Sequence, residues 1–272
     1  MMVKKLILLL FVLTSFLSPS VVVATQELNI AETINQAGLQ RMLSQRMAKN
    51  YILISQGINQ DKAAAELDES AAIFEENLFN LAGSINTTKS KKALKTLKKN
   101  WYGFRSLVLS DINKVHTVNI VKQSSELLES AHSLVLTLEQ SSKSRSDKLI
   151  NVSGRQRMLS QRLALLYFAS NSGYNTKEFK REMKKTANEF TSALSTLKNS
   201  KENSKSIKEQ LEDVGDQWGF YKTKFNGTTN TPFSPRTITV ITESILKEMN
   251  AITKEYELES IRVNKYSAWI LG

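Results

Sequence analysis

The sequence predicts an all-α protein made of two tandem antiparallel four-helix-bundle units. Residues 25–231 contain no proline, glycine is sparse and helix-forming residues dominate. Apolar residues recur at spacings of three and four, as at Leu94 and Leu97, which is the period of an amphipathic helix and not of a strand. One helical motif also occurs twice, as INQAGLQRMLSQRMA at Ile34–Ala48 and as INVSGRQRMLSQRLA at Ile150–Ala164.

Short stretches rich in Gly, Asn, Ser and Thr separate the helical segments, and this composition is typical of turns. The predicted breaks lie at residues 57–59, 83–88, 113–117, 171–175, 199–204 and 226–235. The join at Ser141–Ser146 contains neither Gly nor Pro, so the fourth and fifth segments either separate there or form one continuous helix. With a break at this join, the chain has eight helical segments.

The internal repeat extends well beyond the motif. An offset of 116 positions relates Phe74 to Phe190. We therefore expect a first unit at residues 25–140 and a second at residues 141–272, and a single long bundle with continuous helices is the alternative geometry. Aromatic residues recur in both halves and are predicted to anchor the core: Trp101, Tyr102 and Phe104, then Trp218, Phe220 and Tyr221.

The N-terminal segment has the layout of a secretory signal peptide. Lys4 and Lys5 precede the apolar run Leu6–Leu17, and small residues precede a cleavage point after Ala24. The run is too short for a transmembrane helix of about 20 residues, although an uncleaved anchor is the alternative. Residues 1–24 are therefore predicted to be a cleaved signal peptide, and the mature protein is predicted to be periplasmic.

Composition excludes several functional classes. There is no Cys, and the two histidines, His116 and His132, have no partner at a metal-binding spacing, so neither a metal nor a cofactor is expected. No nucleophile motif or phosphate loop is present, which argues against an enzyme. Loss of two signal-peptide lysines lowers the formal charge from +11 to +9, and this basic surface should attract anions. Nucleic acid is not an expected partner outside the cytoplasm.

Each copy of the motif places small residues, an arginine and a glutamine on one helical face. In the first copy this face is Ile34, Ala37, Gly38, Arg41, Gln45 and Ala48. In the second copy it is Ile150, Ser153, Gly154, Arg157, Gln161 and Ala164. Arg46 and Arg162 fall outside these faces and are expected to form salt bridges or to face solvent.

The chemistry of this face favours a small anion. A glycine inside a helix costs about 1 kcal/mol relative to alanine, so Gly38 and Gly154 should allow a backbone or a ligand to approach closely. If the two motif helices pack about a pseudo-twofold axis, Arg41 and Arg157 meet there as two buried cations. An anion between them would offset the penalty, because planar guanidinium donors suit a planar oxyanion. The alternative is a structural role, in which arginine extends to solvent and glycine only permits close packing.

These observations predict six ligand-binding residues. They are Gly38, Arg41, Gln45, Gly154, Arg157 and Gln161. Ligand binding is expected to change how the two motif helices pack against each other.

The motif resembles the sensor domains of a known family. The string I-N-x-A-G-x-x-R-M-x-S-x-R is similar to the P-box of the periplasmic domains of NarX-type nitrate and nitrite kinases, and AGLQRMLSQRMAK resembles the PilJ-type chemoreceptor N-terminal domain. The resemblance implies a four-helix bundle that binds nitrate or a related anion between the first helices of a dimer. It carries the family's glycine and first arginine over to Gly38 and Arg41, and to Gly154 and Arg157. The chain departs from the family by holding two units in tandem and by lacking an output module.

The predicted function is therefore an exported sensory protein that binds a small anion, with nitrate or nitrite as the first candidate. Its expected signalling partner is a membrane sensor kinase or chemoreceptor, and pairing of the motifs within one chain or across a homodimer are both open. The alternative is a helical adaptor that binds no ligand and pairs with a receptor.

Overall fold

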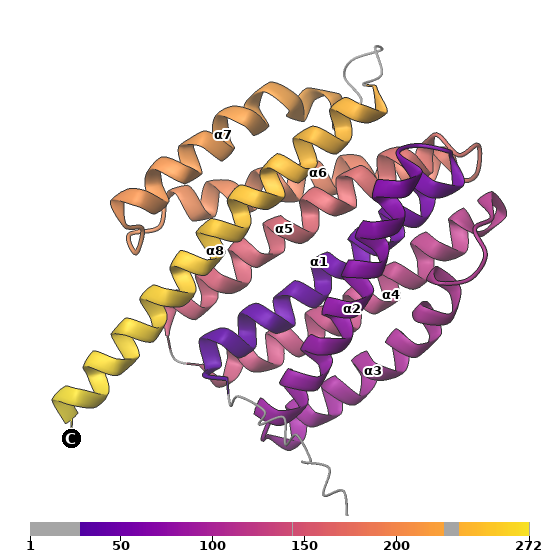
Figure 1. Cartoon of the computed structure of the whole chain (residues 1–272). Helices are drawn as coiled ribbons and strands as arrows, with labels where there is room; N and C mark the ends of the chain where they lie inside the picture. Colours follow the sequence, from indigo (N-terminus) through magenta and orange to yellow (C-terminus); the bar gives the residue numbers. More distant parts are fainter. Residues whose placement is uncertain (1–27, 143, 226–233, 272) are drawn as a thin grey trace, which may run out of the picture.

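The computed structural model describes residues 28–142, 144–225 and 234–271, and these residues are helical with no strand among them (Figure 1). The predicted signal peptide, residues 1–24, lies outside the described residues. The helices are α1 (Ile30–Ser55), α2 (Gln60–Ser84), α3 (Thr88–Val108), α4 (Thr117–Ser141), α5 (Arg145–Ser170), α6 (Thr176–Lys198), α7 (Lys205–Phe225) and α8 (Pro235–Leu271), with a short 3₁₀ turn, Lys114–His116, before α4. The all-α prediction is confirmed.

Local residues explain where the helices begin and end. Asn29 caps α1 through a reciprocal capping box, in which its side chain accepts from the backbone of Glu32. The turns after α1 and α5 each combine a glycine and an asparagine at positive φ, a backbone conformation that these residue types tolerate best. The four residues are Gly57 and Asn59, then Gly173 and Asn175. The turns predicted at residues 57–59 and 171–175 are therefore confirmed, whereas most of the predicted break at 226–235 lies outside the described residues.

The join that the sequence left open is a break. Helix α4 ends at Ser141 and α5 begins at Arg145, so the two do not form one continuous helix. Buried Asp147 in the first turn of α5 accepts hydrogen bonds from Ser142 and from Ser260 on α8, and these contacts hold the junction in place.

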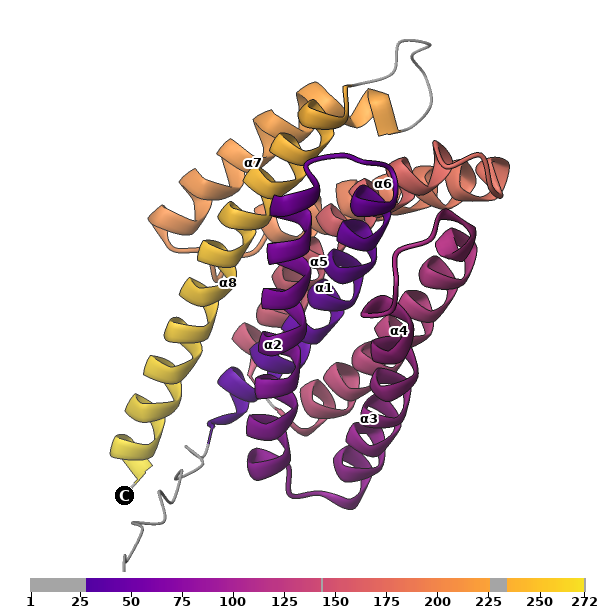
Figure 2. The same ribbon diagram turned by 45° about the vertical axis from the view of Figure 1, so that its right-hand side comes forward.

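The two motif helices lie side by side at the centre of the molecule. Helix α1 packs most extensively on α5, and it also contacts α2 and α4, while α3 covers α4. In the second half, α5 packs on α6 and α8, and α7 contacts both of these. Figures 1 and 2 show the resulting arrangement, with α2–α4 on one side of the central pair and α6–α8 on the other. Where one unit ends and the next begins, at residues 140 and 141, stays a prediction.

Repeated aromatic pairs support each half of the core. Phe74 stacks on Trp101 with ring centroids 4.3 Å apart, and Phe190 lies 4.5 Å from Trp218. The prediction of aromatic core anchors was wrong for Tyr102 and Phe220, which are 65% and 76% exposed because they lie on the outer faces of α3 and α7. None of the helices in the described part of the chain is long and apolar enough to cross a membrane.

Candidate functional site

The glycine faces of α1 and α5 meet at the centre of the molecule. The space beside Gly38 and Gly154 is filled by arginine side chains. A Cβ atom added at Gly38 would lie 3.2 Å from Nη2 of Arg41 and 3.6 Å from Nη2 of Arg157. A Cβ atom at Gly154 would lie 3.1 Å from Nη2 of Arg157 and 3.4 Å from Nη2 of Arg41. The structure therefore brings the two glycines and two arginines together within one chain.

The Arg41 guanidinium crosses from α1 to the opposite motif helix. Its Nη1 donates to Oδ1 of Asn151 at 2.8 Å, and its Nη2 donates to the Asn151 carbonyl oxygen at 3.1 Å. Nδ1 of His132 on α4 lies 3.4 Å from the same Nη1. Arg41 is completely buried, so these neutral groups replace its hydration.

The Arg157 guanidinium makes the reciprocal crossing. Its Nη2 donates to Oδ1 of Asn35 on α1 at 2.6 Å, and its Nη1 donates to Oδ1 of Asn250 on α8 at 3.2 Å. Arg157 is only 4% exposed, and its buried Nε has no hydrogen-bond partner among the described residues. Among the described residues, the Nε–H group of Arg157 is therefore a donor of the arginine pair that is left for another acceptor.

One carboxylate lies behind the asparagine partner of each arginine. The Asn151 side chain donates to Glu139 on α4, and the Asn35 side chain donates to Glu257 on α8. Within the described residues, neither Arg41 nor Arg157 forms a salt bridge of its own. Each cation is thus separated from the nearest of these carboxylates by a neutral amide.

Burial perturbs the ionisation of this group. Burial, followed by the neighbouring cations Arg155 and Arg157, lowers the pKa of Arg41 to about 9. Burial also lowers the pKa of Arg157 to about 10, against the opposing effect of Glu257. Both arginines therefore remain charged at neutral pH. Burial and then Arg41 lower the pKa of His132 to about 4, so its ring is neutral and Nδ1 is able to accept from Arg41.

The two predicted glutamines lie one turn beyond the arginines and are not part of this pair. Gln45 donates from Nε2 to the Ser124 carbonyl at 3.0 Å, and its Oε1 accepts from Arg162 at 2.9 Å. Gln161 is fully buried and makes no hydrogen bond of good geometry with the described residues, although its amide lies near enough to Glu243 to help lower the pKa of that carboxyl. Ligand binding by either glutamine stays a prediction.

Other repeated polar residues of the motif have structural roles. Gln40 donates to the carbonyl of Phe74 on α2, and Gln156 donates to the carbonyl of Phe190 on α6, both at 3.0 Å. Ser44 bonds back to the carbonyl of Arg41. The glutamine contacts attach each motif helix to its neighbour, the serine bond stays within its own helix, and together they account for much of the repeated string without a ligand.

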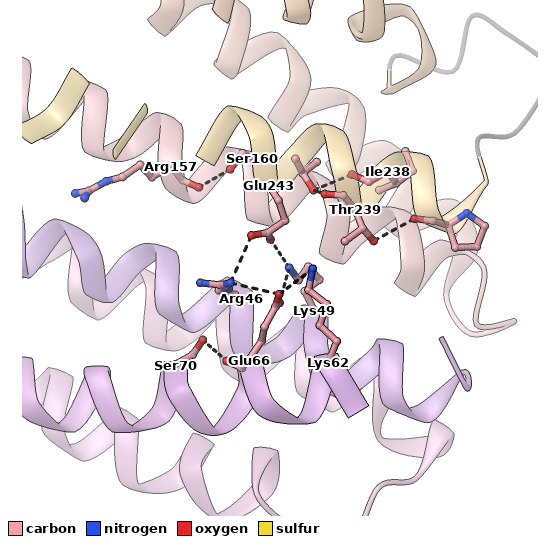
Figure 3. Close-up of polar contacts among 12 residues, drawn as sticks. Arg46, Lys49, Lys62, Glu66, Ser70, Arg157, Ser160, Ile238, Thr239 and Glu243 are labelled. Atoms are coloured by element: carbon pink, nitrogen blue, oxygen red, sulfur yellow. Dashed lines mark hydrogen bonds and ion pairs between the residues drawn. The ribbon is translucent and has the colours of Figure 1, made fainter. Parts of the chain in front are cut away.

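Arg46 belongs to a charged cluster that joins α1 to both α2 and α8. Figure 3 shows Glu66 of α2 and Glu243 of α8 reaching Arg46 and Lys49 of α1 from opposite sides. Lys49 is fully buried, and its Nζ lies 2.6 Å from Glu243 and 3.6 Å from Glu66. Arg162 likewise pairs with Glu182 at 3.8 Å, so the expectation of salt bridges for the two outer arginines is confirmed.

The two asparagines and the residues behind them were not among the site residues predicted from the sequence. Asn35 and Asn151 occupy the same position in both motif copies, so the repeat itself carried the signal. The residues behind them also correspond at an offset of 118 positions between α4 and α8. This offset relates Glu139 to Glu257 and His132 to Asn250. The described residues contain no group of three or more His, Asp or Glu side chains that could hold a metal ion.

The chain matches the model of one protein family. The PilJ family, described as the N-terminal part of type IV pili methyl-accepting chemotaxis transducers, matches residues 22–108 and 136–240. The match covers more than half of the chain in two segments that contain both motif copies. Neither a curated protein nor a solved structure matches.

Proposed function

The chain belongs to the PilJ family of type IV pili chemotaxis transducer N-terminal domains, and we propose that it binds a small anion between α1 and α5 and passes that state to a membrane partner. The observation that carries the proposal is the pair of buried guanidinium groups, Arg41 and Arg157, with no carboxylate bonded to either among the described residues. In this proposal the protein acts in the periplasm as an exported sensory domain.

Electrostatics favours an anion as the ligand of this site. Two buried cations that converge on the same pair of glycines repel each other, and the neutral asparagine oxygens offset only part of the lost hydration. A planar oxyanion would accept from both guanidinium groups and from the unpaired Nε of Arg157. Nitrate and nitrite are the first candidates because they are planar and carry a single charge.

The contacts of the site suggest how binding is transmitted. Arg41 is linked through Asn151 to α4, and Arg157 is linked through Asn35 to α8. An anion that draws the guanidinium groups away from these asparagines would change the packing of α4 and α8 on the central helices. We propose that a membrane chemoreceptor or sensor kinase reads this change.

The second candidate function is an adaptor that binds no ligand. The observation in its favour is that each arginine already has hydrogen-bond acceptors on the opposite motif helix, so the pair could serve only to hold α1 on α5. Pairing with a similar helical domain of a receptor would then be its role.

Thermal unfolding with different anions separates the two candidates. At constant ionic strength, nitrate or nitrite at about 100 times its dissociation constant should stabilise the protein by about 2.7 kcal/mol, and chloride and sulfate should not. Arg41→Gln and Arg157→Gln should each abolish the anion-specific shift. Arg155→Gln is the matched control, since Arg155 pairs with Glu189 and its counterpart in the first motif is Leu39.

An equal stabilisation of the wild-type protein by all four anions would contradict the anion proposal. A nitrate-induced stabilisation that survives both arginine substitutions would also contradict it. Recovery of a membrane receptor by pull-down under those conditions would then support the adaptor.

A further inference from the structure

The outer face of α3 is strongly basic. Helix Thr88–Val108 contains no acidic residue, and its lysines form no ion pair among the described residues. The six lysines are Lys89, Lys91, Lys92, Lys95, Lys98 and Lys99, which we call the α3 lysine face. All are exposed except Lys98, which is partly exposed.

Helix α7 shows that the fold does not need these lysines. An offset of 117 positions aligns α3 with α7. Leu94 corresponds to Leu211 and Trp101 to Trp218, and all four side chains are buried. The outward positions differ in charge, because Lys92, Lys95 and Lys99 of α3 correspond to Glu209, Glu212 and Asp216 of α7. The same packing role therefore occurs with acidic residues at three of the six lysine positions.

The two helices lie on opposite flanks of the molecule, as both views show (Figures 1 and 2). Acidic neighbours of α3 lie toward its C-terminal half, where Glu75 pairs with Arg105 and Glu126 pairs with Lys122. The first turns of α3 carry lysines without such partners. The molecule thus presents a basic flank to one side and the more acidic outer face of α7 to the other.

The N-terminal end of α3 lies close to the point where the upstream chain enters the fold. The backbone amide of Leu28 donates to Oγ of Ser84 at 3.1 Å, and Ser84 is the last residue of α2, immediately before the turn into α3. Residues 1–24, the predicted export segment, precede Leu28. The lysines in the first turns of α3 therefore lie near Leu28, where the described chain begins.

We propose that the α3 lysine face docks on an anionic lipid surface, such as phosphatidylglycerol headgroups, and orients the protein with α7 away from the membrane. A lysine near an anionic bilayer contributes about 1 kcal/mol, which is roughly a fivefold change in affinity. This inference does not depend on anion binding between α1 and α5.

Co-sedimentation of the full chain with lipid vesicles tests the proposal. The wild-type protein should bind vesicles that contain phosphatidylglycerol, and binding should weaken as salt rises. Lys92→Glu with Lys95→Glu should reduce this binding by roughly 25-fold or more. Lys184→Glu with Lys185→Glu on α6 is the matched control, because it makes the same change in net charge at two exposed positions.

The control pair should retain most of the binding. Equal losses for the two pairs would show that only net charge matters and would overturn the proposal. Equal binding to neutral phosphatidylcholine vesicles would also overturn it, because the apolar N-terminal segment would then account for binding. Failure to bind any vesicle, with salt-sensitive retention on an anionic polysaccharide or protein, would assign the lysine face to a different partner.

Discussion

Replacement of Lys49 by leucine should destabilise the protein by about 3 kcal/mol, because it leaves the largely buried Glu243 carboxylate, 23% exposed, without its closest cation. The Lys49 ammonium is completely buried and lies 2.6 Å from Glu243. Replacement of Glu243 by serine in the same chain should restore most of the lost stability. The repeat already contains this combination, because Leu165 on α5 and Ser125 on α4 occupy the positions that correspond to Lys49 and Glu243.

The magnitude follows from the contacts of the cluster. Burial by itself raises the pKa of Glu243, but Lys49 and Arg46 outweigh this effect and hold the pKa below its ordinary value. Removing one partner of a buried pair costs about 3–5 kcal/mol, and Arg46, 3.4 Å from Glu243, keeps the expected loss at the lower end. Glu243→Ser alone should cost about 2 kcal/mol, since Lys49 retains Glu66. The double variant should lie within about 1 kcal/mol of the wild-type protein.

Urea unfolding followed by circular dichroism measures these free energies at neutral pH. The contribution of the ionised Glu243 to the free energy of unfolding is present above its ordinary pKa of 4.5 and is lost as pH falls through its lowered pKa in the folded protein. The destabilisation caused by Lys49→Leu should therefore shrink in acid. Lys62→Leu is the control, because this side chain is 68% exposed and should contribute less than about 1 kcal/mol. A double variant that loses the sum of the two single losses would refute the reasoning.

Two further predictions concern the arginine pair. Gly154→Ala places a Cβ atom 3.1 Å from Nη2 of Arg157, so the guanidinium must move by a few tenths of an ångström, and this movement should weaken the nitrate-induced shift in melting temperature. The helix-propensity gain of about 1 kcal/mol should keep its stability near that of the wild-type protein, and an intact nitrate shift would contradict the assigned role of the glycine. The folded pKa of His132, about 4, lies below its ordinary 6.5, so its contribution to stability is complete above pH 6.5 and is lost as pH falls toward 4. The shift corresponds to at most about 3 kcal/mol, and for this partly exposed ring we expect about 1 kcal/mol. His132→Asn introduces the residue found at the corresponding position, Asn250, and should remove this dependence of the free energy of unfolding on pH. An unchanged pH dependence would exclude His132 as its source.

Much of the fold could be predicted because it depends on local chemistry. Helical periodicity and turns such as Gly57–Asn59 act over a few residues, so a single sequence reveals them. The break after Ser141 could not be predicted, since serine favours neither a turn nor a helix strongly enough. The pairing of α1 with α5 was also open, because side chains far apart in sequence determine whether two amphipathic faces meet within one chain or between two.

The candidate site could be predicted in part for the same reason. Wheel geometry and the repeat placed Arg41 and Arg157 at a common axis, and the structure brings their side chains together. The asparagine partners were missed because a motif helix shows which face a residue occupies but not what lies across the interface. Gln45 shares the arginine face, yet its amide is used by Ser124 and Arg162 of neighbouring helices.

Comparison of the two halves gives the strongest argument that the arginine pair is retained for a ligand. Where a charged residue has an uncharged counterpart in the repeat, its partner changes as well, both for the buried Lys49 and for the partly exposed Arg155. Lys49 and Glu243 correspond to Leu165 and Ser125, and Arg155 and Glu189 correspond to Leu39 and Ile73. Charge and countercharge are thus gained or lost together, as expected when an unpaired buried charge is costly. Arg41 and Arg157 depart from this pattern, because both halves keep the cation and both place a neutral asparagine where a carboxylate could stand. An anion that arrives from outside would complete the pattern at this one position.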